Sequence, residues 1–278
     1  MTDTAIYPIS DWSDAYANAS YIGDAQSYIT LWESSASAFR AQMLELDRAQ
    51  LDISYGSKAR NKLDLFLPES TPKGLVVFVH GGYWMRFDKS SWSHFARGSL
   101  EAGYAVAMPS YTLCPEVSIA DIVLEIGEAI NCAAQKIDGE IRLCGHSAGG
   151  HLVTSMLCDD SPLPVQVQTR IAKTVSISGV HDLRALLNTG MNEQLHLNWS
   201  EAVALSPALK APAHLAPLTC WVGADERPEF RRLNALQANI WKSFEISTEA
   251  VEEGGRHHFD IINGLQELQH PLMQSLLE

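Results

Sequence analysis

Short, continuous apolar segments recur along the chain and are separated by segments with helical periodicity. The apolar segments are Gly74–His80, Tyr104–Met108, Ile141–Cys144, Thr174–Ile177 and Leu218–Val222. Such segments are typical of strands buried on both faces of a parallel sheet. The helical patterns between and after them include Ile119–Ala134, His151–Leu157 and Arg231–Lys242. The alternation predicts an α/β fold with a mostly parallel central sheet and helices on both of its faces.

The two ends of this pattern differ from its middle. Residues 11–49 are predicted to be helical, with apolar positions at Tyr28, Leu31, Ala36, Phe39, Met43 and Leu44. Strands are expected at Leu51–Tyr55, at Lys62–Leu67 and, last in the chain, at Phe244–Ser247. Residues 181–212 are less regular and are expected to form a small helical cap over the strand ends. The prediction is a single domain over residues 1–278, with an N-terminal helical extension (1–50) and a cap-like insertion (about 181–212).

Composition and charge exclude several classes of protein. The 278 residues include 20 Lys and Arg against 33 Asp and Glu, a net charge of −13, which disfavours nucleic acid and anionic membranes as partners. The five cysteines are odd in number and contain no CxxC pair, so neither a disulfide framework nor a zinc site is expected. The N-terminus lacks the features of a secretory signal, and no apolar run could span a membrane. A cytoplasmic location is therefore predicted.

The strongest candidate for chemistry is the segment Gly145-His146-Ser147-Ala148-Gly149, which lies between a predicted strand and a predicted helix. G-x-S-x-G in this context is typical of a nucleophile elbow, in which a sharp turn presents the serine above the sheet. Gly145 and Gly149 allow the sharp bend because they lack a Cβ. We expect Ser147 to be the nucleophile and the N–H of Ala148 to face a developing oxyanion.

A second glycine-containing loop, His80-Gly81-Gly82-Tyr83-Trp84, directly follows a predicted strand. It is similar to the His-Gly-Gly-Gly oxyanion loop of lipases and esterases, with Tyr83 at the position of the third glycine. Two backbone N–H groups must point at one oxygen in such a loop. Gly82 and Tyr83 are the predicted donors, together with Ala148. Aromatic residues at and after the loop, namely Trp84, Phe87 and Trp92, are predicted to line a substrate pocket.

A catalytic triad on this scaffold has the chain order Ser, acid, His. After the strand Leu218–Val222, the turn contains both Asp225 and Glu226. The spacing G-x-x-acid from Gly223 favours Glu226 and leaves Asp225 as the alternative. The base is expected in Gly254–Asp260, where His257 and His258 are adjacent. We favour His258 because the apolar Phe259 follows it and is expected to begin a packed helix.

The sequence resembles the kynurenine formamidase (arylformamidase) branch of the α/β-hydrolase superfamily. The resemblance covers nearly the whole chain and rests on HGGYW, GHSAGG and further segments: Leu63–Phe66, Tyr111–Pro115, Ser178–Leu183, Leu205–Pro207, Arg227–Phe230 and His258-Phe259. The family's Asp-x-Pro-Glu-Phe motif aligns its Asp with Glu226, and its His-Phe falls on His258 and Phe259. Glu in place of Asp is a departure, and either carboxylate can orient an imidazole.

The resemblance implies hydrolysis of N-formyl-L-kynurenine to formate and L-kynurenine. A carboxylesterase acting on short-chain or aryl esters is the alternative, because it would use the same residues. Neither mechanism requires a metal or an organic cofactor. A small molecule is the expected partner. The sequence does not specify the oligomeric state and is compatible with a homodimer.

Overall fold

A central sheet of eight strands organises the computed structural model, which describes residues 9–213 and 216–278. The strands are β1 (Ala49–Ser54), β2 (Lys62–Phe66), β3 (Gly74–Val79), β4 (Ala105–Pro109), β5 (Glu140–His146), β6 (Ile171–Ile177), β7 (Leu218–Gly223) and β8 (Thr248–Glu253). Their order across the sheet is β1-β2-β4-β3-β5-β6-β7-β8. The pairs β1–β2 and β2–β4 are antiparallel, and the other neighbouring pairs are parallel. The predicted α/β fold is confirmed.

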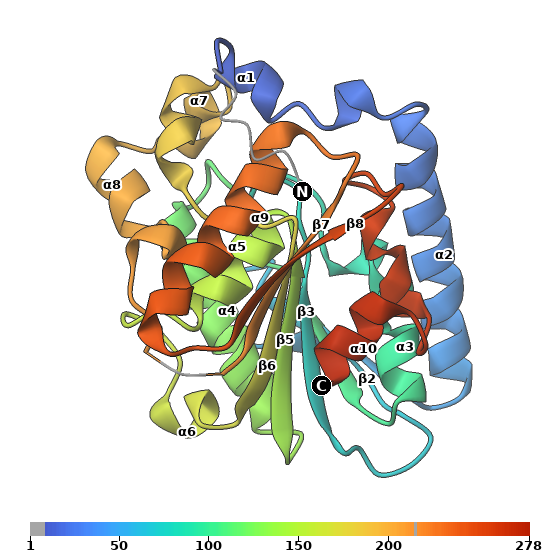
Figure 1. Cartoon of the computed structure of the whole chain (residues 1–278). Helices are drawn as coiled ribbons and strands as arrows, with labels where there is room; N and C mark the ends of the chain where they lie inside the picture. Colours follow the sequence, from blue (N-terminus) through green and yellow to red (C-terminus); the bar gives the residue numbers. More distant parts are fainter. Residues whose placement is uncertain (1–8, 214–215) are drawn as a thin grey trace.

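Helices cover both faces of the sheet (Figure 1). The α-helices are α1 (Trp12–Ala15), α2 (Ala25–Glu45), α3 (Arg97–Glu101), α4 (Ile119–Ala134), α5 (Ala148–Ser155), α6 (Val165–Gln168), α7 (Asn192–Leu195), α8 (Trp199–Ala204), α9 (Pro228–Trp241) and α10 (Pro271–Leu277). Short 3₁₀ helices are η1 (Ala19–Tyr21), η2 (Lys89–Ser91), η3 (Ser93–Ala96), η4 (Leu183–Asn188), η5 (Pro207–Leu209), η6 (Lys242–Phe244) and η7 (Ile261–Gln266). Helices α4, α5 and α9 lie against one face, and α2, α3 and α10 lie on the other.

Strand β3 shows how the sequence builds a core on each face. Its residues are all buried, because successive side chains point to opposite faces of a sheet that is covered on both sides. Leu75 and Val77 belong to the cluster beneath α4, α5 and α9. Val76 and Phe78 belong to the cluster that includes residues of α2 and α10. The continuous apolar segment in the sequence therefore reflects the burial of β3 side chains on both faces of the sheet.

The boundaries of α4 match the predicted helix Ile119–Ala134. Ser118 caps its N-terminus: the Ser118 hydroxyl accepts from the Asp121 N–H, and the Asp121 carboxylate accepts from the Ser118 N–H. This reciprocal pair satisfies backbone donors that the first helical turn cannot satisfy. Helix α5, by contrast, begins at Ala148 and not at the predicted His151, so it starts directly after Ser147.

The predicted N-terminal helix is divided into α1, η1 and α2. The break falls near Gly23 and Asp24, and Asp24 has a left-handed backbone (φ 52°). Helix α2 buries Trp32, Ala36, Phe39 and Met43 at helical spacing, whereas the predicted core positions Leu31 and Leu44 are more than half exposed. Residues 1–8 of the predicted extension lie outside the described residues.

The predicted strand Phe244–Ser247 is wrong. Residues 242–244 form η6, Glu245 adopts a left-handed backbone (φ 62°), and the edge strand β8 occupies Thr248–Glu253. Only one side of an edge strand pairs with a neighbour, and half of the β8 positions are exposed. The sequence TEAVEE therefore lacks the apolar signal that marks the inner strands.

Residues 181–212 are helical, as expected for the cap-like segment, and contain η4, α7, α8 and η5. Asn198 and Glu201 form a capping box at the start of α8. Within the described part of the chain, no helix is both long enough and apolar enough to cross a membrane.

Candidate active site

Ser147 lies at the junction of β5 and α5, in a strained backbone conformation (φ 56°, ψ −116°). The glycines of its motif make this turn feasible: a Cβ on Gly145 would overlap the carbonyl of Gly149, and a Cβ on Gly149 would overlap the carbonyl of Val79. The Ser147 N–H donates to the carbonyl of Ile177 at 2.8 Å, which holds the turn against β6. The predicted strand–turn–helix geometry is present, with a strained residue at its apex.

The loop after β3 lies beside this turn. A Cβ on Gly81 would approach the Cβ of Ser147 to 3.0 Å. Gly82, Tyr83 and Trp84 all have positive φ (110°, 53° and 60°), and the Gly82 carbonyl accepts the N–H groups of Met85 and Arg86. Among the described residues, no hydrogen-bond acceptor pairs with the N–H groups of Gly82, Tyr83 or Ala148. These three donors therefore remain available to an oxyanion.

The structure brings Glu226, and not Asp225, to His258. The Oε2 of Glu226 lies 2.6 Å from Nδ1 of His258, and both side chains are buried. Because the carboxylate accepts, Nδ1 of His258 is the donor, and in the neutral imidazole this leaves the lone pair on Nε2. Asp225 is exposed: its N–H donates to the carbonyl of Arg256 at 2.9 Å, and its carboxylate has no hydrogen-bond or ion-pair partner among the described residues.

His257 faces a different part of the molecule. Its Nε2 lies 3.1 Å from the hydroxyl of Tyr28 on α2, and the two rings pack edge to face. Phe259 packs against Trp32 on the same helix, with ring centroids 5.1 Å apart. The two adjacent histidine side chains therefore point in different directions: His257 toward Tyr28 on α2 and His258 toward Glu226.

His146 connects the nucleophile turn to the base. Its Nε2 lies 2.9 Å from the carbonyl oxygen of His258, and the two imidazole centroids are 4.7 Å apart. Burial lowers the pKa of His146 well below its usual range, so its ring is neutral and donates from Nε2 to the carbonyl. No hydrogen bond joins the Ser147 hydroxyl to His258 within the described residues; such bonds commonly tighten only when substrate is bound.

The three aromatic residues predicted to line a substrate pocket lie in different environments. Trp84 and Trp92 are 0% and 1% exposed, respectively, and belong to the cores on opposite faces of the sheet. Trp84 packs edge-on against His151, and Trp92 packs against Trp32. Burying an indole removes a large apolar area from water, so both rings serve the cores and not an open surface. Phe87, by contrast, borders an open hollow of about 630 Å³, together with the exposed Arg86.

The sequence did not identify the N-terminal segment as part of the site. The hydroxyl of Tyr83 donates to the carbonyl of Tyr16 (2.5 Å) and accepts from the side-chain amide of Asn18 (3.0 Å). Arg227, next to Glu226, forms an ion pair with Asp14. Residues 14–18 thus bridge the predicted oxyanion loop and the turn that carries the acid. No local motif in these residues indicates such a contact.

The sequence also missed Ser178, which directly follows β6. Its hydroxyl donates to Oε1 of Glu226 at 2.5 Å, and the N–H of Gly223 donates to the same oxygen at 2.9 Å. Ser178 is fully buried and has a left-handed backbone (φ 52°). A polar residue at the carboxyl end of an inner strand is the one signal that could have identified it.

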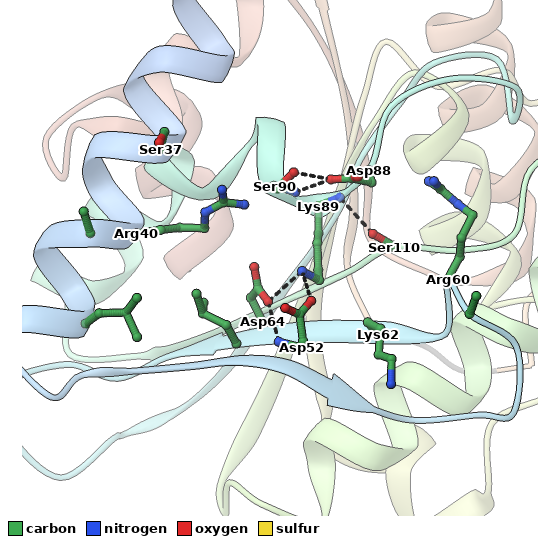
Figure 2. Close-up of a pocket in the computed structure, with 14 residues that line it drawn as sticks. Ser37, Arg40, Asp52, Arg60, Lys62, Asp64, Asp88, Lys89, Ser90 and Ser110 are labelled. Atoms are coloured by element: carbon green, nitrogen blue, oxygen red, sulfur yellow. Dashed lines mark hydrogen bonds and ion pairs between the residues drawn. The ribbon is translucent and has the colours of Figure 1, made fainter.

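A polar hollow of about 530 Å³ lies apart from these residues, between α2 and the antiparallel edge of the sheet (Figure 2). Lys89 fills its base, with Nζ 2.8 Å from Asp52 and 2.8 Å from the buried Asp64. Ser147, Glu226 and His258 do not line it. This cluster pairs the buried Lys89 ammonium with two carboxylates, and only Oδ1 of Asp64 takes part in it.

Two features define the class of this protein: a mostly parallel sheet whose first strands are antiparallel, and a serine at a strained strand-to-helix turn. Both are typical of the α/β-hydrolase superfamily, and this protein is a serine hydrolase of that class. Comparison with known proteins gives the family. The family model described as BD-FAE matches residues 63–220. Kynurenine formamidase from Danio rerio is 30% identical over 240 residues, which span 82% of this chain and 80% of that protein. The chain belongs to the BD-FAE family and to the kynurenine formamidase-like branch of the superfamily, which confirms the predicted resemblance.

Solved structures agree with the fold. A crystal structure from Silicibacter sp. TM1040, described as a "putative thioesterase", is 47% identical, with a TM-score of 0.91 over 96% of this chain and 98% of that one. An esterase from Pyrobaculum calidifontis has the same fold at 18% identity, with a TM-score of 0.70 over 97% of each chain.

Proposed function

We propose that the protein is an arylformamidase that hydrolyses N-formyl-L-kynurenine to formate and L-kynurenine through Ser147, His258 and Glu226. The observation that carries the proposal is the buried 2.6 Å hydrogen bond between Glu226 and His258, at the sheet edge where Ser147 lies. It leaves Nε2 of His258 as the basic atom, which is the protonation state that a general base requires. The curated relative from Danio rerio, named kynurenine formamidase, supports the formamide as substrate.

In the proposed mechanism, Nε2 of His258 takes the hydroxyl proton of Ser147 while Oγ attacks the formyl carbon. The N–H groups of Gly82, Tyr83 and Ala148 stabilise the negative charge on the carbonyl oxygen. His258 then donates its proton to the departing aryl amine, leaving a formyl ester on Ser147. Water, deprotonated by His258, hydrolyses this ester to formate. Glu226 remains ionised throughout and stabilises the imidazolium.

The surroundings of Ser147 favour a small acyl group. Its side chain is almost completely buried, and the neighbouring Tyr83 is held by residues 16–18 of the N-terminal segment. Formyl is the smallest acyl group, and an aromatic amine leaves more readily than an alkylamine. A formamide of an aromatic amine therefore suits a buried nucleophile, and the proposed mechanism requires no metal.

The test compares kcat/KM of the purified enzyme for N-formyl-L-kynurenine, p-nitrophenyl acetate and a short acyl thioester. We expect a value of about 10⁴ M⁻¹s⁻¹ or higher for the formamide, within the usual enzyme range. A value for either ester that exceeds the formamide value by several orders of magnitude would refute the formamidase assignment and leave the triad unaffected.

Hydrolysis of an ester or thioester is the second candidate. It is favoured by the 47% identical protein described as a thioesterase. The chemistry of acylation and deacylation is the same, and only the leaving group differs. The thioester arm of the comparison above distinguishes this candidate directly.

A further inference from the structure

Among the described residues, two side chains donate hydrogen bonds to the Glu226 carboxylate: His258 and Ser178. The Ser178 hydroxyl lies 2.5 Å from Oε1, and all three side chains are buried. The Ser178 N–H donates to the carbonyl of Trp221 on β7 at 2.7 Å. Ser178 therefore connects the end of β6 to both the strand and the turn that carry Glu226.

The two donors to Oε1 constrain Glu226 differently. Gly223 is the last residue of β7, so its N–H ties the carboxylate to the strand that leads into the turn of Glu226 itself. Ser178 follows β6, so its hydroxyl ties the carboxylate to the neighbouring strand as well. A glutamate has one more rotatable bond than an aspartate, and rotation about its last bond would move Oε2 away from His258. The Ser178 hydroxyl opposes that rotation by holding Oε1.

We propose that Ser178 is a positioning residue for the reaction, which holds the Glu226 carboxylate so that Oε2 faces His258. This inference rests on the proposed catalytic role of Glu226. Ser178 acts through Glu226 and His258 and not on the substrate. Its loss should therefore lower kcat, because the imidazolium is less well stabilised, and should leave KM nearly unchanged.

The experiment uses Ser178→Ala and Ser178→Gly in the full chain, with p-nitrophenyl acetate as substrate. Both variants remove the hydroxyl, and glycine also suits the left-handed backbone at φ 52°. A hydrogen bond to a charged group predicts a 10- to 100-fold fall in kcat, to an order of magnitude, with KM changed by less than about twofold. Ser176→Ala is the matched control, because Ser176 is an equally buried serine on β6 whose hydroxyl meets His181. It should keep kcat within about threefold of the parent.

A double-mutant cycle with Glu226→Gln separates positioning from a general structural effect. In the Glu226→Gln background, Ser178→Gly should lower kcat by less than about twofold further, because its effect runs through the carboxylate. An equal loss in both backgrounds, a change confined to KM, or an unchanged kcat in folded Ser178→Gly would overturn the inference. If Glu226→Gln is itself fully active, the proposed triad fails. If Glu226→Gln is inactive and the Ser178 variants are active, only the positioning role fails.

Discussion

Ser147, Glu226 and His258 follow three different strands, β5, β7 and β8. Parallel strands end at one edge of the sheet, and residues just beyond their carboxyl ends meet there. Each of the three residues is held by a hydrogen bond from elsewhere in the chain. The Ile177 carbonyl accepts the Ser147 N–H, and the Ser178 hydroxyl donates to the Glu226 carboxylate. The His146 ring donates to the carbonyl of His258. The proposed chemistry thus depends on hydrogen bonds between segments far apart in sequence.

Ser147→Ala should reduce kcat/KM for N-formyl-L-kynurenine by at least about 10³-fold, because the nucleophile is lost while the fold is retained. A fluorophosphonate probe should label the parent protein at Ser147 and should not label the variant. Ser243→Ala, which changes an exposed serine, is the control for both measurements. Labelling that persists in Ser147→Ala would place the nucleophile at another residue.

Glu226→Gln should lower kcat by about 10²- to 10⁴-fold, because an amide at this position no longer stabilises the imidazolium. Asp225→Asn should stay within about twofold of the parent, since the Asp225 carboxylate is exposed and has no partner among the described residues. Each variant removes one negative charge from the parent protein, so each serves as the charge control for the other. The reverse result, with Asp225→Asn inactive, would assign the acid to Asp225.

At the scale of elements, the contact between the N-terminal segment and the site was not predicted from the sequence. Asn18 and the carbonyl of Tyr16 hold the hydroxyl of Tyr83, whose own backbone has positive φ. The loop that carries two of the predicted oxyanion donors is therefore fixed from its far side by a segment more than sixty residues earlier in the chain.

Tyr83→Phe should test this connection, because it removes both hydrogen bonds and keeps the backbone N–H. We expect a loss of about 1–3 kcal/mol in the free energy of unfolding, measured by urea denaturation, because the buried Asn18 amide loses its partner. The Tyr16 carbonyl keeps the N–H of Asn18 as a donor. We expect kcat to fall by roughly tenfold as the loop loosens. Tyr21→Phe is the matched control: it removes one hydrogen bond, from an exposed hydroxyl to Asp14, and should change stability by less than about 0.5 kcal/mol. Equal effects of the two substitutions would contradict the role assigned to Tyr83.

Local sequence patterns predicted some elements well and others poorly. The apolar segment of β3 and the periodicity of α4 have strong local signals, and both elements lie close to their predicted positions. Strand β8 was misplaced because an exposed edge strand tolerates Thr and Glu. Trp84 and Trp92 were assigned to a pocket from their clustering in sequence, whereas the structure places them in cores on opposite faces of the sheet.

At the scale of the whole molecule, five buried histidines connect stability to pH. Burial lowers the pKa of His80, His94 and His151 to about 4 and that of His181 to about 3, and it lowers the pKa of His146 well below its usual range. In the unfolded chain the same groups titrate near pH 6.5. Between about pH 6.5 and pH 4 the unfolded state therefore binds more protons than the folded state, and stability falls as the pH falls.

Each such histidine contributes up to about 1.4 kcal/mol per pH unit within that window. Several acting together can exceed the total stability of a typical domain, so the protein should unfold before the pH reaches about 4. The measurement is the urea midpoint at pH 7.5, 6 and 5, which should decrease with increasing steepness. His94→Gln removes one titrating group and should make the decrease less steep. A midpoint that is constant from pH 7.5 to 5 would contradict the prediction.

The sequence by itself determined the α/β class, the nucleophile turn and the glycine-containing loop, because these depend on residues that are neighbours in the chain. The order of strand, sharp bend and helix around Ser147 can be predicted from Cys144 to His151 alone, although the helix begins three residues earlier than predicted. Only the tertiary structure decided which acid and which histidine meet, since Asp225 and Glu226, like His257 and His258, are adjacent and chemically similar. The packing of Tyr28, Ser178 and the strand ends separates them. Local patterns, the G-x-x-acid spacing and the Phe259 that follows His258, favoured this pair but left the neighbouring residues as alternatives. Hydrogen bonds and burial between distant segments make the choice.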